Sequence, residues 1–67
     1  MKLTWRDIDE IAIDLVETYP DVDPMSVGND ELQKMVTELP GFSDHPDAAT
    51  ERILEAIQAA WYDEYED

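Results

Sequence analysis

Apolar residues recur at helical spacing along three stretches of the chain. In the first stretch they fall at intervals of three or four residues from Trp5 to Tyr19, which predicts one face of an amphipathic helix. Thr4 and Asp7 have the spacing of a capping box, with Asp in place of the usual Glu, so we expect the helix to begin at Thr4. Pro20 should end it, because the residue before a proline is pushed out of helical geometry.

The second apolar stretch follows a connector that is rich in turn-forming residues. Asp23-Pro24 is typical of an N-cap followed by proline at the first helical position, so a single helical turn is expected over 24–27. A second helix, capped by Asn29 or Asp30, should come next. Pro40-Gly41 should end this helix, and Phe42 should then pack back onto the core. The expected buried stripe consists of Leu32, Met35, Val36 and Leu39.

The last apolar stretch predicts a helix from about Glu51 to Tyr65. The acids at its C-terminal end oppose the helix dipole, so we expect fraying beyond Trp61. Cap candidates before this helix are Ser43, Asp44 and Thr50; the residues expected to face the core are Ile53, Leu54, Ile57, Ala60 and Trp61; those expected to face solvent are Glu51, Glu55, Gln58 and Tyr62. Residues 1–67 are therefore predicted to form one mainly α domain with about three helices and at most a minimal β pairing.

The charge of the chain restricts its partners. Eighteen Asp and Glu residues face four Lys and Arg residues, which gives a formal net charge of -14 on 67 residues. Such a field repels nucleic acid and anionic lipid, and it attracts basic protein surfaces and cations. It also favours a monomer. No apolar run is long enough for a membrane span, and no apolar segment typical of a secretory signal follows the first Lys, so a cytoplasmic location is expected.

The absence of cysteine removes several kinds of chemistry. Without cysteine the chain has no disulfide, no zinc-thiolate site, no thiol nucleophile and no thiolate ligand for an iron–sulfur cluster. Paired carboxylates could act as acid and base only in a cleft that raises one pKa, and a chain this short offers little room for one. The sequence also has no phosphate-cradling glycine loop and no Ser-His-Asp arrangement. We therefore expect the protein not to be an enzyme.

Acidic residues follow one another along one side of the first helix. At about 100° per residue they fall within roughly one quadrant, and Asp21 and Asp23 continue the series after the helix. A solvated face is the ordinary explanation for such a stripe, but a soluble helix usually mixes both signs of charge, and here only Arg6 lies near the edge. A surface for a basic partner is the alternative that this pattern favours. The stripe consists of Asp7, Glu10, Asp14 and Glu17.

The same carboxylates, and His45 between Asp44 and Asp47, are the candidate metal ligands. Oxygen ligands suit hard or borderline divalent ions, including ferrous iron. Exposed carboxylates that are not preorganised should bind such ions with dissociation constants on the order of 10⁻⁴ M or weaker. A histidine in a Ser-Asp-His-Pro turn is more typical of a surface or capping residue than of a ligand. Among the aromatic residues, Tyr62 and Tyr65 fall outside the buried stripe and are candidate partner contacts.

The residues named so far resemble the IscX family, the small acidic proteins of bacterial iron–sulfur cluster assembly. The resemblance spans nearly the whole chain without a gap. One stretch departs from the pattern. After Val27, relatives often have a basic residue and an aromatic residue, whereas this chain has Gly28-Asn29-Asp30. A small strand pairing expected there should therefore be shortened. The matching positions are Trp5, Asp7, Glu10-Ile11, Leu15, Tyr19-Pro20-Asp21, Asp23-Pro24, Leu39, Phe42, Asp44, Pro46, Glu51, Ile53-Leu54-Glu55-Ala56-Ile57, Trp61, Asp63 and Glu64.

This resemblance implies a compact, mainly helical domain related to the winged helix. It also implies an adaptor or regulator that binds the cysteine desulfurase IscS, in competition with bacterial frataxin, and that binds ferrous iron (Fe2+) weakly, with no tightly held cofactor. Two alternatives stay open: an iron donor for cluster assembly, and an acidic DNA mimic. The implied partner-binding residues are Asp7, Glu10, Asp14, Glu17, Asp21, Asp23, Asp63 and Glu64, and the implied weak iron ligands are the first four of these.

Overall fold

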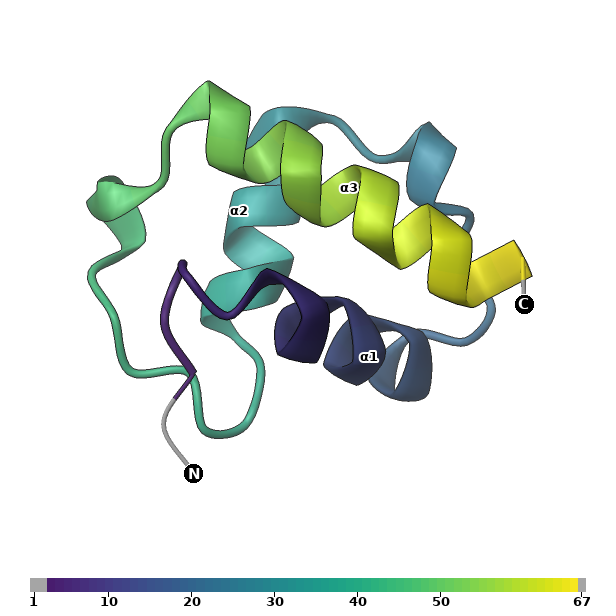
Figure 1. Ribbon diagram of the computed structural model, residues 1–67, viewed down its shortest axis with the longest axis horizontal. Helices are drawn as coiled ribbons and strands as arrows, with labels where there is room; N and C mark the ends of the chain where they lie inside the picture. The colour runs from purple at the N-terminus through teal and green to yellow at the C-terminus, as the bar shows by residue number, and fades with distance from the viewer. Residues whose placement is uncertain (1–2, 67) are drawn as a thin grey trace.

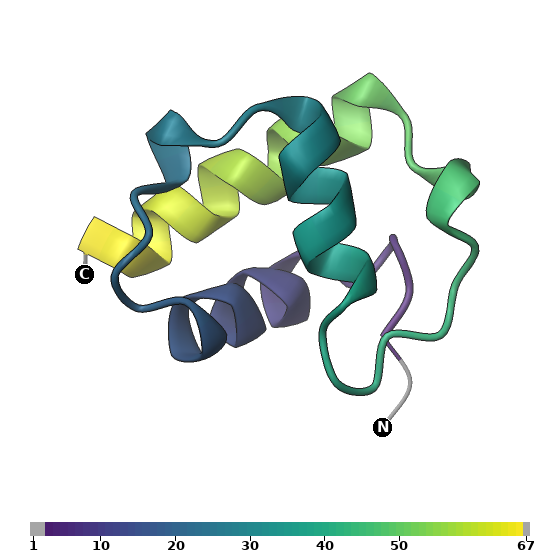
Figure 2. The ribbon, with the colours of Figure 1, turned by 180° about the vertical axis from the view of Figure 1, so that it is seen from behind.

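This computed structural model describes residues 3–66. Three α-helices and two short turns of 3-10 helix, joined by loops, form this part of the chain. The helices α1 and α3 run side by side in the same general direction, and α2 packs across both (Figure 1; Figure 2). The domain is therefore mainly α, as the apolar spacing predicts. The elements in order are α1 (Ile8–Thr18), η1 (Pro24–Ser26), α2 (Asn29–Thr37), η2 (Pro46–Ala48) and α3 (Glu51–Glu66).

The start of α1 differs from the prediction. The N-cap is Asp7 and not Thr4. The Asp7 carboxylate accepts hydrogen bonds from the backbone N–H and the hydroxyl of Thr4, at 3.0 and 3.3 Å, and the Asp7 N–H donates to the Thr4 carbonyl at 3.0 Å. The predicted pair therefore forms, but it closes a separate turn before the helix. This turn directs Trp5 into the core, where its side chain is 2% exposed.

The ends of the other helices follow local chemistry. α2 is capped by Gly28, without a side-chain hydrogen bond, rather than by Asn29 or Asp30. Thr50 caps α3, since its hydroxyl accepts from the Ile53 N–H at 3.2 Å. α3 continues to Glu66, so the prediction of fraying beyond Trp61 is wrong for the described residues.

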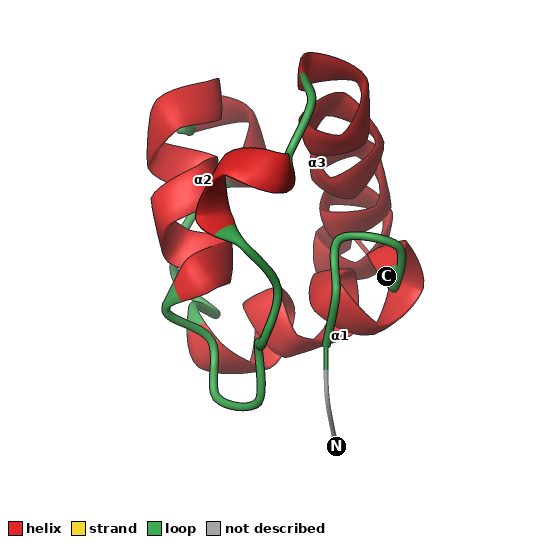
Figure 3. Cartoon of the chain, turned by 90° about the vertical axis from the view of Figure 1, so that its left-hand side faces the viewer, coloured by secondary structure: helices red, strands yellow, loops and turns green. Residues whose placement is uncertain are grey.

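Strand structure within residues 3–66 is limited to one parallel bridge between Leu3 and Phe42, and Figure 3 accordingly shows helices joined by loops. The bridge lies away from 27–30, where the departure from the IscX pattern falls. Gly41 has a φ of 85°, a conformation that suits glycine, because a side chain would be strained there. The turn at Gly41 brings Phe42 back against Trp5, with the rings edge-to-face and their centroids 4.9 Å apart.

The core fills the space between the three helices. Trp61 is fully buried, and its indole N–H has no hydrogen-bond partner among the described residues; the indole N–H of Trp5, in contrast, donates to the His45 carbonyl at 2.7 Å. No helix in this part of the chain has the length and apolar character needed to cross a bilayer. The buried apolar cluster consists of Trp5, Ile11, Ala12, Leu15, Val27, Leu32, Val36, Leu39, Leu54, Ile57 and Trp61.

Candidate docking surface

The acidic residues of α1 lie away from the core because the opposite side of the helix is fixed in it. Ile11, Ala12 and Leu15 are fully buried. Glu10 and Glu17 are consequently exposed, whereas Asp7 and Asp14 are half-buried. We call these four acids (Asp7, Glu10, Asp14 and Glu17) the α1 acid stripe.

The surroundings of the α1 acid stripe differ along its length. At its N-terminal end Arg6 shares a shallow depression with Asp7, Asp9 and Glu10. Further along, Glu10 and Asp14 border a hollow that Leu3 and the Pro40-Gly41 turn complete. Asp7 is already held by the two hydrogen bonds from Thr4. Glu10, Asp14 and Glu17 are therefore the acids of the stripe with the most freedom to meet a partner.

The loop after α1 carries the acidic surface round one end of the molecule. It leaves α1 at Tyr19, passes the C-terminal end of α3 and reaches η1 (Figure 1). Asp21 and Asp23 are exposed on this loop. The Asp23 carboxylate caps η1 by accepting from the Met25 N–H at 3.0 Å, and Pro24 occupies the first position of this turn, as predicted. Asp23 is thus fixed in place, beside the last turns of α3.

Asp23 and the C-terminal acids of α3 form a second acidic group around Tyr62. A hydrogen bond from its hydroxyl to Glu66, and the negative charges of Glu66, Asp23 and Asp63, raise the pKa of Tyr62 above its usual value of 10.0. Asp63 and Glu64 are exposed. The predicted partner-binding residues are therefore divided between the α1 acid stripe and this group, with the loop at 19–23 connecting them.

Gln58 is a structural residue that the sequence pattern assigned wrongly to solvent. Its side-chain amide is half-buried and donates to the carbonyls of Pro24 and Val27, at 2.8 and 3.0 Å. These two bonds hold η1 against α3. No local pattern identifies this role, because the partners are 31 and 34 residues away.

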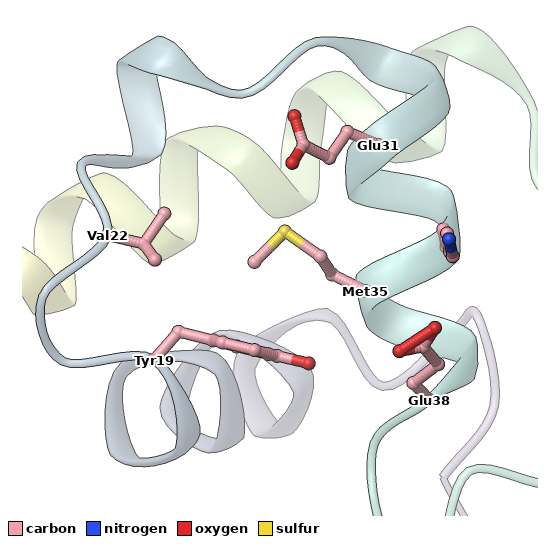
Figure 4. Close-up of a pocket in the computed structure, with 6 residues that line it drawn as sticks. Tyr19, Val22, Glu31, Met35 and Glu38 are labelled. Atoms are coloured by element: carbon pink, nitrogen blue, oxygen red, sulfur yellow. The ribbon is translucent and has the colours of Figure 1, made fainter.

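A further hollow, of about 310 Å³, opens between the end of α1 and α2. Tyr19, Val22 and Met35 point toward one another across it, and Glu31 of α2 and Glu38, the C-cap of α2, lie at its edge (Figure 4). Lys34 also lines this hollow, so both signs of charge are present. The charge around this hollow is accordingly less one-sided than around Tyr62.

The carboxylates of residues 3–66 do not gather into a metal centre. No group of three or more His, Asp or Glu side chains in this part of the chain is placed to hold an ion. His45 is exposed, and its main chain supports the fold: its N–H donates to Asp44 at 2.8 Å and its carbonyl accepts from Trp5. Asp44 also accepts from the Trp5 N–H, and these two backbone donors lower the Asp44 pKa below its usual 3.8.

Comparison with known proteins identifies the family. A family model described as iron–sulphur cluster assembly matches residues 3–66. The chain belongs to this family, that of IscX. A protein of Pseudomonas aeruginosa with no characterised role is similar: 53% identical over 64 residues, which cover 96% of this chain and 97% of that protein. The IscX-family resemblance is thus confirmed, and it places the acidic surface in a protein of iron–sulphur cluster assembly.

Proposed function

We propose that this IscX-family protein is an adaptor that regulates a cysteine desulfurase, IscS, by docking its acidic surface onto a basic surface of that enzyme. The observation that carries the proposal is the one-signed charge at the end of the molecule formed by α1, the loop at 19–23 and the last turns of α3. Glu17, Asp21, Asp23 and Asp63 are exposed there, and Glu10 is exposed near the other end of α1, beside Arg6. The basic residues within the described chain, Arg6, Lys34 and Arg52, belong to other parts of the sequence or to the edge of the stripe.

Physical chemistry supports a docking role over a catalytic one. Like charges at neighbouring helical positions destabilise an isolated helix by roughly 0.2–0.5 kcal/mol per pair, and a basic partner relieves that repulsion. Charges around an interface chiefly raise the association rate and its dependence on salt. The resemblance to IscX suggests the partner: the IscS surface that bacterial frataxin also uses, in the cytoplasm. A monomeric, non-enzymatic protein of this charge would compete with frataxin for that surface.

Iron binding is a secondary property in this proposal. The surface carboxylates, those of the α1 acid stripe included, would hold ferrous iron weakly, because they are not preorganised into a chelate. Delivery of iron is the rival role, and it predicts that regulation of the desulfurase depends on added iron. The adaptor role predicts that regulation persists without it.

The test is calorimetric titration of the protein into IscS with paired charge reversals. Glu10→Lys with Asp14→Lys should weaken binding at least tenfold in dilute buffer. Asp47→Lys with Glu51→Lys makes the same change in net charge, but on η2 and the start of α3, and should weaken binding less than threefold. Equal losses in both pairs would indicate a non-specific effect of net charge, and unchanged affinity in the first pair would reject the docking surface. Repeating the desulfurase assay with and without ferrous iron separates regulation from delivery.

A further inference from the structure

The most exposed large apolar side chain in residues 3–66 lies beside the second acidic group. Met25 of η1 is 64% exposed, and Tyr62 of α3 is 37% exposed. Together with Ala59 they line a hollow of about 430 Å³, which Glu55, Gln58 and Asp63 complete. We call these six residues the Met25–Tyr62 hollow. Single exposed apolar residues are ordinary on a protein surface, but two of them sharing one hollow form a site at which an apolar group can be buried.

The hollow is held in shape by hydrogen bonds that do not involve its apolar side chains. Gln58 fixes the carbonyls of Pro24 and Val27, on either side of Met25 in the chain, to α3. Asp23 fixes the Met25 N–H itself, and Pro24 is fully buried. Because the backbone around Met25 is constrained at both ends, little conformational freedom remains for a partner to remove on binding. The unbranched Met side chain can then adapt its shape to the group that enters.

The charges around the hollow select its occupant. Glu55 and Asp63 line it, and Asp23 and Glu66 are close enough to act on the Tyr62 hydroxyl. Among residues 3–66, none that lines it is basic, in contrast to the hollow between α1 and α2, where Lys34 is present. An occupant must therefore be apolar at its centre and positively charged at its rim, which is the arrangement of an apolar anchor in a protein interface with a polar border.

We propose that the Met25–Tyr62 hollow is the anchor of the docking surface: it receives one apolar side chain from a Lys- and Arg-rich segment of the desulfurase, whose basic groups lie against Asp23, Glu55 and Asp63. This inference rests on the proposed function and adds a contact of different chemistry to it. Charged rim contacts weaken as salt rises, whereas burial of an apolar group does not. The two contributions to binding can therefore be separated by ionic strength.

The test variant carries both Met25→Ser and Tyr62→Ala. The control variant is Tyr65→Ala, which alters a tyrosine of similar exposure on the same helix outside the hollow. Calorimetric titration into IscS is run in dilute buffer and at high salt, and circular dichroism verifies that each variant is helical. The double variant should lose about tenfold in affinity at both salt concentrations, and Tyr65→Ala less than threefold.

Three results would overturn the inference. The first is wild-type affinity in the double variant, and the second is an equal loss in Tyr65→Ala. The third comes from sedimentation: a dimer of this chain that the double variant disperses would make a second copy the occupant. If the Glu10 and Asp14 reversals still weaken binding in any of these cases, the proposed function stands without the anchor. If those reversals have no effect while the double variant loses affinity, the hollow contacts the desulfurase, but the acidic docking surface fails and the hollow is not its anchor.

Discussion

Replacing Gln58 by Glu tests the most consequential long-range contact in the fold. The substitution keeps the shape of the side chain but removes the amide donors that bind the Pro24 and Val27 carbonyls at 2.8 and 3.0 Å. A net contribution of about 1 kcal/mol for each hydrogen bond gives a loss of about 2 kcal/mol. Gln58→Ala should therefore cost about 2 kcal/mol, and Gln58→Glu about 2–3 kcal/mol, because a carboxylate facing two carbonyl oxygens adds repulsion.

Thermal and urea unfolding followed by circular dichroism measure this loss. In a domain of this size each kcal/mol shifts Tm by roughly 4–8 °C, so Gln58→Glu should lower Tm by roughly 10–20 °C. Glu55→Gln is the matched control, since it makes the reverse exchange on the exposed side of α3 one turn earlier and should change stability by less than about 0.5 kcal/mol. If Gln58→Glu were as stable as the control, the two hydrogen bonds would not hold η1 on α3.

Three further predictions concern ionisation and capping. The lowered pKa of Asp44 means that its stabilising contribution is present above pH 3.8 and is lost as pH falls through the lower folded value; Asp44→Asn should therefore destabilise the protein at neutral pH, by an amount that shrinks in acid, as urea unfolding across pH would show. Glu66→Gln should bring the raised pKa of Tyr62 back toward 10.0 in an NMR titration, and the wild type should lose this contribution to stability as pH rises through the folded pKa. Gly28→Ser should stabilise the protein by about 0.5–1 kcal/mol in urea unfolding, because Gly28 is an N-cap without a side-chain bond and a Cβ there meets nothing within 4 Å; a loss of stability would contradict this.

The three helices were predictable because the apolar spacing identifies each helical segment and proline or glycine follows the first two. α1 ends directly before Pro20, as predicted, whereas α2 ends at Thr37 with Glu38 as its C-cap, before the predicted stop at Pro40-Gly41. The apolar residues of all three helices reach the core they share. The start of α1 was not predictable from the same information. The hydrogen bonds of Asp7 with Thr4 are similar in a capping box and in a separate turn, and the choice between them depends on Trp5, whose indole needs the His45 carbonyl 40 residues away.

The candidate site was predictable in its residue types but not in its grouping. Helical geometry alone places the α1 acid stripe on one side of its helix. The second acidic group depends on the path of the loop at 19–23, and no periodicity describes that path. Tyr62 was noticeable as an aromatic outside the buried stripe, but Met25 was not, because a methionine in a short turn carries no pattern. The contacts that hold its turn on α3 are long-range, because Gln58 binds the Pro24 and Val27 carbonyls from 34 and 31 residues away.

In the proposed docking on the desulfurase, the charged and the apolar contacts of the surface would act at different stages of binding. Charges on α1 and its following loop act over about 10 Å at moderate salt, so they speed encounter with a basic surface without fixing the complex. Differences in affinity between related complexes lie mostly in dissociation, which depends on close contacts such as the burial of an apolar group. On this reasoning, changes in the α1 acid stripe should alter mainly how fast the protein finds the desulfurase, and changes at Met25 and Tyr62 should alter mainly how long it stays. In the proposed complex, the α1 acid stripe alone would give fast association and fast dissociation, whereas the Met25–Tyr62 hollow alone would give slow association.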